Sequence, residues 1–128
     1  MALLLKNGVG LLSVTGVATD LSTTGATTLY TVPVGNSCIL MPSWLKAGGD
    51  VGASLALTIG QVGALTDYIG TTNGDNLDAT DDIILLAPVP SATPPTNKVY
   101  AAGTVLQINI AVGGNAVAGT VYLFGFLF

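Results

Sequence analysis

The stretch from Thr27 to Ala47, TTLYTVPVGNSCILMPSWLKA, constrains the fold more than any other part of the chain. Its first half, up to Val32, is rich in the β-branched and aromatic residues that favour strands. Pro33 cannot donate a ladder hydrogen bond, and Gly35-Asn36 supplies the backbone freedom that a tight turn needs. Because a second extended run, Ser37 to Leu45, leaves the same turn, the pattern predicts a β-hairpin inside an antiparallel sheet.

Further short segments along the chain have the alternation or the apolar content of strands. The sequence predicts strands at Val9–Val17, Ala53–Gln61, around Tyr68-Ile69, at Ile83–Ala87, between Tyr100 and Val112, and at Val117–Phe128. Ile83–Ala87 is apolar throughout, which is typical of a buried central strand, and Gly113-Gly114-Asn115 predicts a second hairpin. About eight or nine short strands, together with 17 glycines that disfavour helices, indicate an all-β fold, an antiparallel β-sandwich of jelly-roll-like kind.

The 128 residues suffice for one domain, so we expect residues 1–128 to form a single β-sandwich, with residues 1–8 as a possible N-terminal arm. Nothing in that arm has the charge pattern of a signal peptide, and no apolar run is long enough for a transmembrane helix. Pro88 to Asn97 contains four of the six prolines and is interpreted as an extended surface loop that crosses between the two sheets.

The last predicted strand has two apolar faces. Aromatic residues alternate with Val121, Leu123 and Leu127, so one set can fill the core while the other, containing aromatics, should be covered by another subunit. Both faces of Cys38–Leu45 are also apolar, and Pro42 indicates an edge position or a bulge. Trp44 is predicted to be a core anchor or an interface residue. The predicted subunit-interface residues are Leu3, Leu4, Leu5, Trp44, Tyr122, Phe124, Phe126 and Phe128.

The charged residues are few: three lysines and seven aspartates, with no Glu, Arg or His, and a net charge of −4. Lys6, Lys46 and Lys98 lie far apart in the sequence, which argues against binding to nucleic acid or to a membrane surface, because both rely on clustered cations. A charged content of 8%, against a usual share of about 25%, leaves a surface suited to packing against other protein.

Candidate catalytic chemistry is missing from the sequence. No His or Glu is present to exchange protons, and Cys38, the single cysteine, has no imidazole to activate it and is interpreted as a small buried side chain. We therefore expect no enzyme activity, no catalytic residues and no cofactor. The stretch Asp67 to Asp82 holds five of the seven aspartates; it is interpreted as a solvated acidic turn, with a Ca²⁺ site as the alternative, although its spacing does not match an EF-hand.

The segments TLYTVPVGN, AAGTVLQINI and GTVYLFGFLF resemble small β-sandwich virion proteins of tailed bacteriophages, such as capsid decoration (cement) proteins and head- or tail-fibre modules. The resemblance covers Leu21 to Phe128 and offers no functional residues to transfer. It implies a homotrimeric decoration protein that binds the major capsid protein on the capsid exterior, stabilises the head shell and is made in the bacterial host cytoplasm. The alternative is a receptor- or carbohydrate-binding fibre module, for which only Tyr68, Tyr100 and the acidic stretch could serve.

Overall fold

The computed structural model describes residues 8–13, 15–87 and 98–128. Ten strands and no helix are present in this part of the chain, so it contains no helix that could cross a membrane. The strands are β1 (Gly8–Leu11), β2 (Val17–Asp20), β3 (Gly25–Thr31), β4 (Cys38–Ala47), β5 (Ala56–Gln61), β6 (Ala64–Asn73), β7 (Ile83–Leu86), β8 (Val99–Tyr100), β9 (Val105–Val112) and β10 (Ala118–Leu127). The predicted all-β class is confirmed, with slightly more strands than expected.

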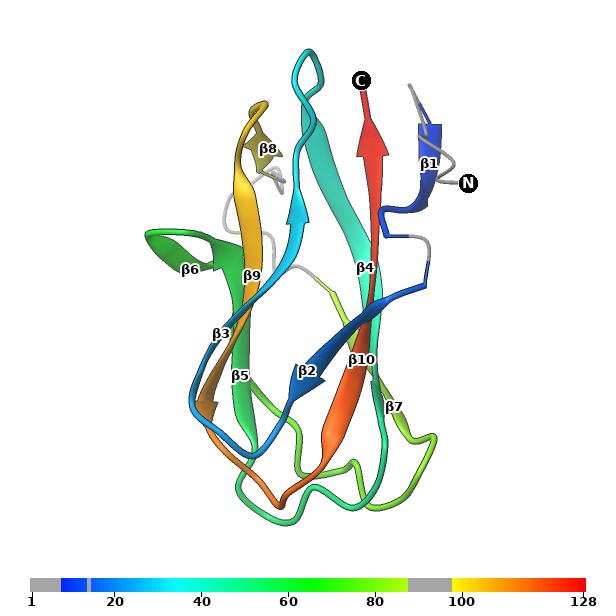
Figure 1. Cartoon of the computed structure of the whole chain (residues 1–128), viewed down its shortest axis with the longest axis vertical. Helices are drawn as coiled ribbons and strands as arrows, with labels where there is room; N and C mark the ends of the chain where they lie inside the picture. The colour runs from blue at the N-terminus through cyan, green and yellow to red at the C-terminus, as the bar shows by residue number, and fades with distance from the viewer. Residues whose placement is uncertain (1–7, 14, 88–97) are drawn as a thin grey trace, which may run out of the picture.

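The strands form two antiparallel sheets that pack over a common core (Figure 1). The six-stranded sheet has the order β1-β10-β4-β7, with β2 also paired to β10 and β8 also paired to β4. The four-stranded sheet has the order β3-β9-β5-β6. The strand expected at Val9–Val17 is not continuous. β1 and β2 are separate strands that pair with successive halves of β10.

The two predicted hairpins are wrong, although both turns are placed correctly. β3 belongs to the four-stranded sheet and β4 to the six-stranded sheet, so the turn after Val32 carries the chain from one sheet to the other. The segment 113–115 does the same between β9 and β10. The hairpin that does form joins β5 to β6 through Val62-Gly63, where Gly63 has a φ of +86°. Turn-forming residues determine where a chain reverses, and they do not determine which sheet receives the returning strand.

Two other predictions about strands need correction. The run at Ile83–Ala87 forms the edge strand β7, paired only with β4, and exposes Ile83 and Leu85. The short strand expected around Tyr68-Ile69 is the ten-residue β6. The predicted crossover loop at residues 88–97 lies outside the described residues; β7 and β8 on either side of it both pair with β4.

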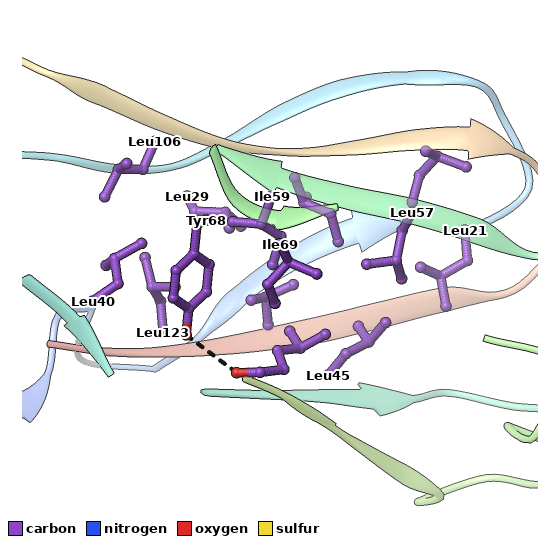
Figure 2. Close-up of a cluster of buried hydrophobic side chains, with 14 of the residues drawn as sticks. Leu21, Leu29, Leu40, Leu45, Leu57, Ile59, Tyr68, Ile69, Leu106 and Leu123 are labelled. Atoms are coloured by element: carbon purple, nitrogen blue, oxygen red, sulfur yellow. Dashed lines mark hydrogen bonds between the residues drawn. The ribbon is translucent and has the colours of Figure 1, made fainter. Parts of the chain in front are cut away.

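The core is made of aliphatic side chains that point inward from both sheets. Leu57 and Ile59 of β5 and Leu45 and Leu123 of the six-stranded sheet are almost completely buried, and Figure 2 shows such side chains filling the space between the sheets. Each buried side chain of this size contributes about 1.5 to 3 kcal/mol through removal of its surface from water. Cys38 is also fully buried, as predicted.

A β-bulge in β4 changes which of its side chains face the core. Met41 pairs with Phe124 and Trp44 pairs with Tyr122, so two residues of β4 lie opposite one residue of β10. Pro42, which cannot donate a ladder bond, lies within this bulge, as its position predicted. The Ser43 hydroxyl stabilises it by donating to the Met41 carbonyl at 2.8 Å and accepting from the Phe124 N–H at 2.9 Å. As a result Leu45 faces the core and Trp44 faces outward.

We expect the Gly35→Val substitution to destabilise the fold by about 1 to 3 kcal/mol. Gly35 has a φ of +83°, in the region that β-branched residues avoid, and the Asn36 N–H donates to the Pro33 carbonyl across the turn. No atom lies within 4 Å of the position that a Cβ would take, so only the backbone conformation opposes a side chain. Gly35→Asn is the matched control, because Asn tolerates this region; equal midpoints of urea unfolding for the two variants would contradict the prediction.

Candidate functional site: the outer face of the six-stranded sheet

The aromatic residues of β10 lie on the solvent side of the six-stranded sheet. Burial alternates strictly along β10, with Val121, Leu123 and Leu127 in the core and Tyr122 and the phenylalanines outside. The predicted division of this strand into an aliphatic core face and an aromatic outward face is therefore confirmed.

Neighbouring strands extend this aromatic stripe into a continuous apolar surface, which we call the outer face. The strand register aligns its residues in three rows, because directly opposed residues of antiparallel strands lie on the same side of a sheet. The rows are Val9, Phe126, Ile39 and Val99; Leu11, Phe124 and Met41; and Tyr122, Trp44 and Leu85, with Phe128 beside the first row. None of these residues carries a charge.

Aromatic side chains of the outer face pack against one another. The rings of Trp44 and Phe124 meet edge to face with centroids 5.4 Å apart, and those of Phe126 and Phe128 stack at 5.5 Å. Trp44 is 46% exposed and Leu85 is 61% exposed. A preformed, flat surface with large exposed apolar side chains is typical of a protein–protein contact, because little side-chain entropy is lost when it is covered.

The outward side of the four-stranded sheet has the opposite character. Gln107 and Asn109 of β9 point outward, and the Gln107 side-chain amide donates to the Thr28 hydroxyl at 3.2 Å. This polar side can remain in water at no cost. The contrast between the two sheets identifies the outer face as the candidate site.

The structure brings together five of the predicted interface residues, all on the outer face: Trp44, Tyr122, Phe124, Phe126 and Phe128. Leu3, Leu4 and Leu5 lie outside the described residues. The sequence analysis did not assign Val9, Leu11, Ile39, Met41, Leu85 and Val99 to the site. For Ile39 and Met41, the apolar character of both faces of Cys38–Leu45 could have indicated that they belong to the site. The exposure of Leu85, in contrast, depends on the edge position of β7.

Tyr68 connects the two sheets under the outer face. It projects from β6 across the core, as Figure 2 shows. Its hydroxyl donates to the Met41 carbonyl at the bulge and also lies 3.1 Å from the Leu86 carbonyl. Burial raises the pKa of Tyr68 to about 12. It likewise raises the pKa of the Cys38 thiol to about 11, so this thiol is protonated and unreactive at neutral pH.

The protein should lose stability in alkaline solution above pH 9. Cys38 and Tyr68 have ordinary pKa values of 9.0 and 10.0, and their folded-state values are raised. Their stabilising contribution is therefore complete below the ordinary values and is lost as the pH rises through about 11 and 12. Urea unfolding at increasing pH measures this, with Cys38→Ala expected to remove the part that begins at pH 9. An unchanged pH profile for Cys38→Ala would contradict the assignment to Cys38.

The aspartates between Asp67 and Asp82 support the local backbone. The Asp82 carboxylate accepts the N–H groups of Asp78 and Ala79 at 2.9 Å, and Asp81 pairs with Lys46 at 2.7 Å. Within residues 8–13, 15–87 and 98–128, no three acidic or cysteine side chains are arranged to hold a metal ion. The contacts of Asp82 are those of a turn, whereas Asp67 lies in β6.

Comparison with known proteins gives a likeness in fold. A scan against protein-family models finds no match, and neither does a search of curated proteins. Among solved structures, a chain of the cyanophage Pam1 capsid asymmetric unit is similar, with a TM-score of 0.54 and 16% sequence identity. The match covers 95% of this chain and 86% of that chain, so the likeness includes both sheets.

Proposed function

We propose that this chain is a non-enzymatic structural protein of a bacteriophage virion, and more specifically a capsid decoration protein that stabilises the head shell. The observation that carries the proposal is the outer face, an apolar surface with large exposed side chains that is bordered by one cation, Lys46, and is suited to being covered by protein. The similarity in fold to a chain of a phage capsid structure supports the same conclusion.

The order in which the chain visits the two sheets supports a jelly-roll connection. If β1 with β2, and β7 with β8, are each counted as one interrupted strand, the fold has eight strands with four in each sheet. Jelly rolls consist of eight strands in two sheets. Every connection except the β5–β6 hairpin and the two interruptions leads from one sheet to the other.

The proposed assembly is a homotrimer that is made in the host cytoplasm and binds the major capsid protein on the outside of the shell. Copies of the chain meet through their outer faces. No catalysis is assigned to the chain, because the sequence has no His or Glu and its cysteine is buried and protonated at neutral pH.

Two measurements test the proposal. Sedimentation velocity of the isolated protein should give a stable oligomer, and a monomer persisting at every concentration would exclude self-association. Cryo-electron microscopy of phage particles should show the protein evenly distributed over the head, missing from particles that lack its gene. Density restricted to a fibre or tail would exclude the decoration role.

The second candidate is a receptor- or carbohydrate-binding module of a fibre. The proximity of Tyr100 to Asp67 favours it slightly, since sugar sites combine aromatic and acidic groups; the Tyr100 hydroxyl donates to the Asp67 carboxylate at 3.0 Å. Tyr100 is buried, however, and Asp67 also pairs with Lys98 at 2.6 Å. Strong, selective signals on a glycan array would support this candidate over the decoration protein.

A further inference from the structure

The two ends of the sandwich differ sharply in charge. At one end the loops β2–β3, β4–β5, β6–β7 and β9–β10 contact one another; for example, the Gly114 N–H donates to the Leu21 carbonyl and the Val51 N–H donates to the Leu77 carbonyl. This acidic end lies at the bottom of Figure 1. It carries six of the seven aspartates, Asp20, Asp50, Asp75, Asp78, Asp81 and Asp82, and Lys46 is the only lysine among the described residues near them.

The opposite end, which we call the apolar end, is formed by the tips of three turns and the C-terminus. The Gly103 N–H donates to the Val32 carbonyl, the Val62 N–H donates to the Val105 carbonyl, and Phe128 exchanges two backbone hydrogen bonds with Ser37. The β3–β4 and β8–β9 turns and the C-terminus lie at the top of Figure 1, and the β5–β6 turn lies below them at its left side, joined to the start of β9 by the bond from Val62 to Val105.

Exposed apolar side chains project from this end. Val34, in the β3–β4 turn, is 93% exposed, and Val62, in the β5–β6 turn, is 59% exposed. Ala102 of the β8–β9 turn and Phe128 are exposed beside them. In the described part of the chain, the charged side chains near the apolar end are Asp67 and Lys98, which neutralise each other, and the α-carboxylate of Phe128 lies at the same end.

We propose that the apolar end is the surface by which the protein binds the virion shell, with the acidic end directed outward. This inference rests on the proposed function. A protein that binds to a shell needs one surface that can be buried against the shell and an opposite surface that can remain in water, because burial of charged groups is costly. The charged side chains of this molecule are concentrated at one end in the corresponding way. Six aspartate carboxylates would oppose burial of the acidic end, whereas the one aspartate near the apolar end, Asp67, is paired with Lys98.

The chemistry of the apolar end favours an uncharged protein surface as its partner. Its exposed groups are small aliphatic side chains and one phenylalanine, so it has few side-chain donors or acceptors to recognise a sugar. Lys98, the one cation there, is paired with Asp67, and the protein carries a net charge of −4, so anionic lipid is not attracted.

The outer face and the apolar end then have separate tasks. Copies that associate through their outer faces around an axis parallel to the strands present all their apolar ends in the same direction. Each end is small and binds weakly, but linked copies bind about 10² to 10⁴ times more tightly than one copy, because the later contacts become intramolecular. The separation predicts that either surface can be disabled without the other.

The test is the Val34→Asp substitution, with Thr24→Asp at the acidic end as the matched control. Both residues are exposed in turns, so neither change should affect folding or the oligomer, which urea unfolding and sedimentation velocity verify. Cosedimentation with phage heads that lack the protein should show binding weakened about tenfold or more for Val34→Asp and unchanged for Thr24→Asp. Val62→Asp provides a second, independent variant at the same end.

Each outcome decides between the proposals. If wild-type protein binds heads and Val34→Asp and Val62→Asp bind equally well, the docking surface is wrong while the decoration role stands. If wild-type protein does not bind heads, the proposed function fails, and this inference fails with it. Flotation with phosphatidylcholine–phosphatidylglycerol vesicles tests lipid as the alternative partner. If the wild-type protein binds these vesicles and Val34→Asp does not, the partner of the apolar end is lipid and the proposed binding to the shell is wrong.

Discussion

The Trp44→Lys variant should be a monomer under conditions where the wild-type protein is an oligomer. Trp44 lies in the outer face against Phe124. No residue of the outer face carries a carboxylate that could pair with a new ammonium group, and Asp81, near the next row, is already paired with Lys46. Covering the variant would bury an unpaired charge and lose an aromatic anchor, which costs about 2 kcal/mol or more per contact. Each contact should therefore be weakened about 30-fold or more, as measured by sedimentation velocity over a range of concentrations.

The matched control is Gln107→Lys, which adds the same charge to the polar side of the four-stranded sheet. It should leave the oligomer intact. Leu85→Lys is a second outer-face variant; Leu85 lies on the edge strand β7, where lysine is well tolerated, so the fold should be retained. Oligomers that persist in both outer-face variants while Gln107→Lys dissociates would place the interface on the other sheet.

The aromatic part of the outer face could be predicted because alternation is a local property of an extended chain. In Val117–Phe128 the period of two separates the aromatics from Val121, Leu123 and Leu127 in any sheet, whatever its neighbours. The same alternation places Leu106 and Ile108 of β9 in the core. The residues that the neighbouring strands contribute to the outer face could not be predicted from alternation, because they depend on the order of the strands in the sheet.

Sheet assignment was the part of the fold that local sequence could not give. Ile83-Ile84-Leu85-Leu86 reads as a buried strand because it is wholly apolar, yet β7 is an edge strand and Leu85 contributes to the outer face. An apolar run indicates that both faces of the strand are covered. It does not indicate whether they are covered by the same chain or by another molecule. The bulge at Pro42 was predictable from the missing donor, but its effect, the outward position of Trp44, required the register with β10.

The Gly113→Ala substitution should destabilise the protein by about 3 kcal/mol or more. A Cβ at position 113 would lie 1.9 Å from the Ser22 carbonyl oxygen, an approach that cannot be relieved by rotating a side chain. The crowding arises because the β9–β10 connection passes between sheets and packs against the β2–β3 loop, next to the hydrogen bond from Gly114 N–H to Leu21. Gly70→Ala is the control, since nothing lies within 4 Å of a Cβ there, and it should leave the urea midpoint nearly unchanged.

Gly113→Asn separates this explanation from the hairpin that the sequence predicted. In a tight hairpin turn, glycine is needed for a positive φ, and asparagine is an accepted substitute. Here Gly113 does not have a positive φ, in contrast to Gly35, and the requirement is for space. Gly113→Asn should therefore be at least as destabilising as Gly113→Ala, whereas Gly35→Asn should be tolerated. A stable Gly113→Asn protein would mean that the connection is a hairpin and that β9 and β10 share a sheet.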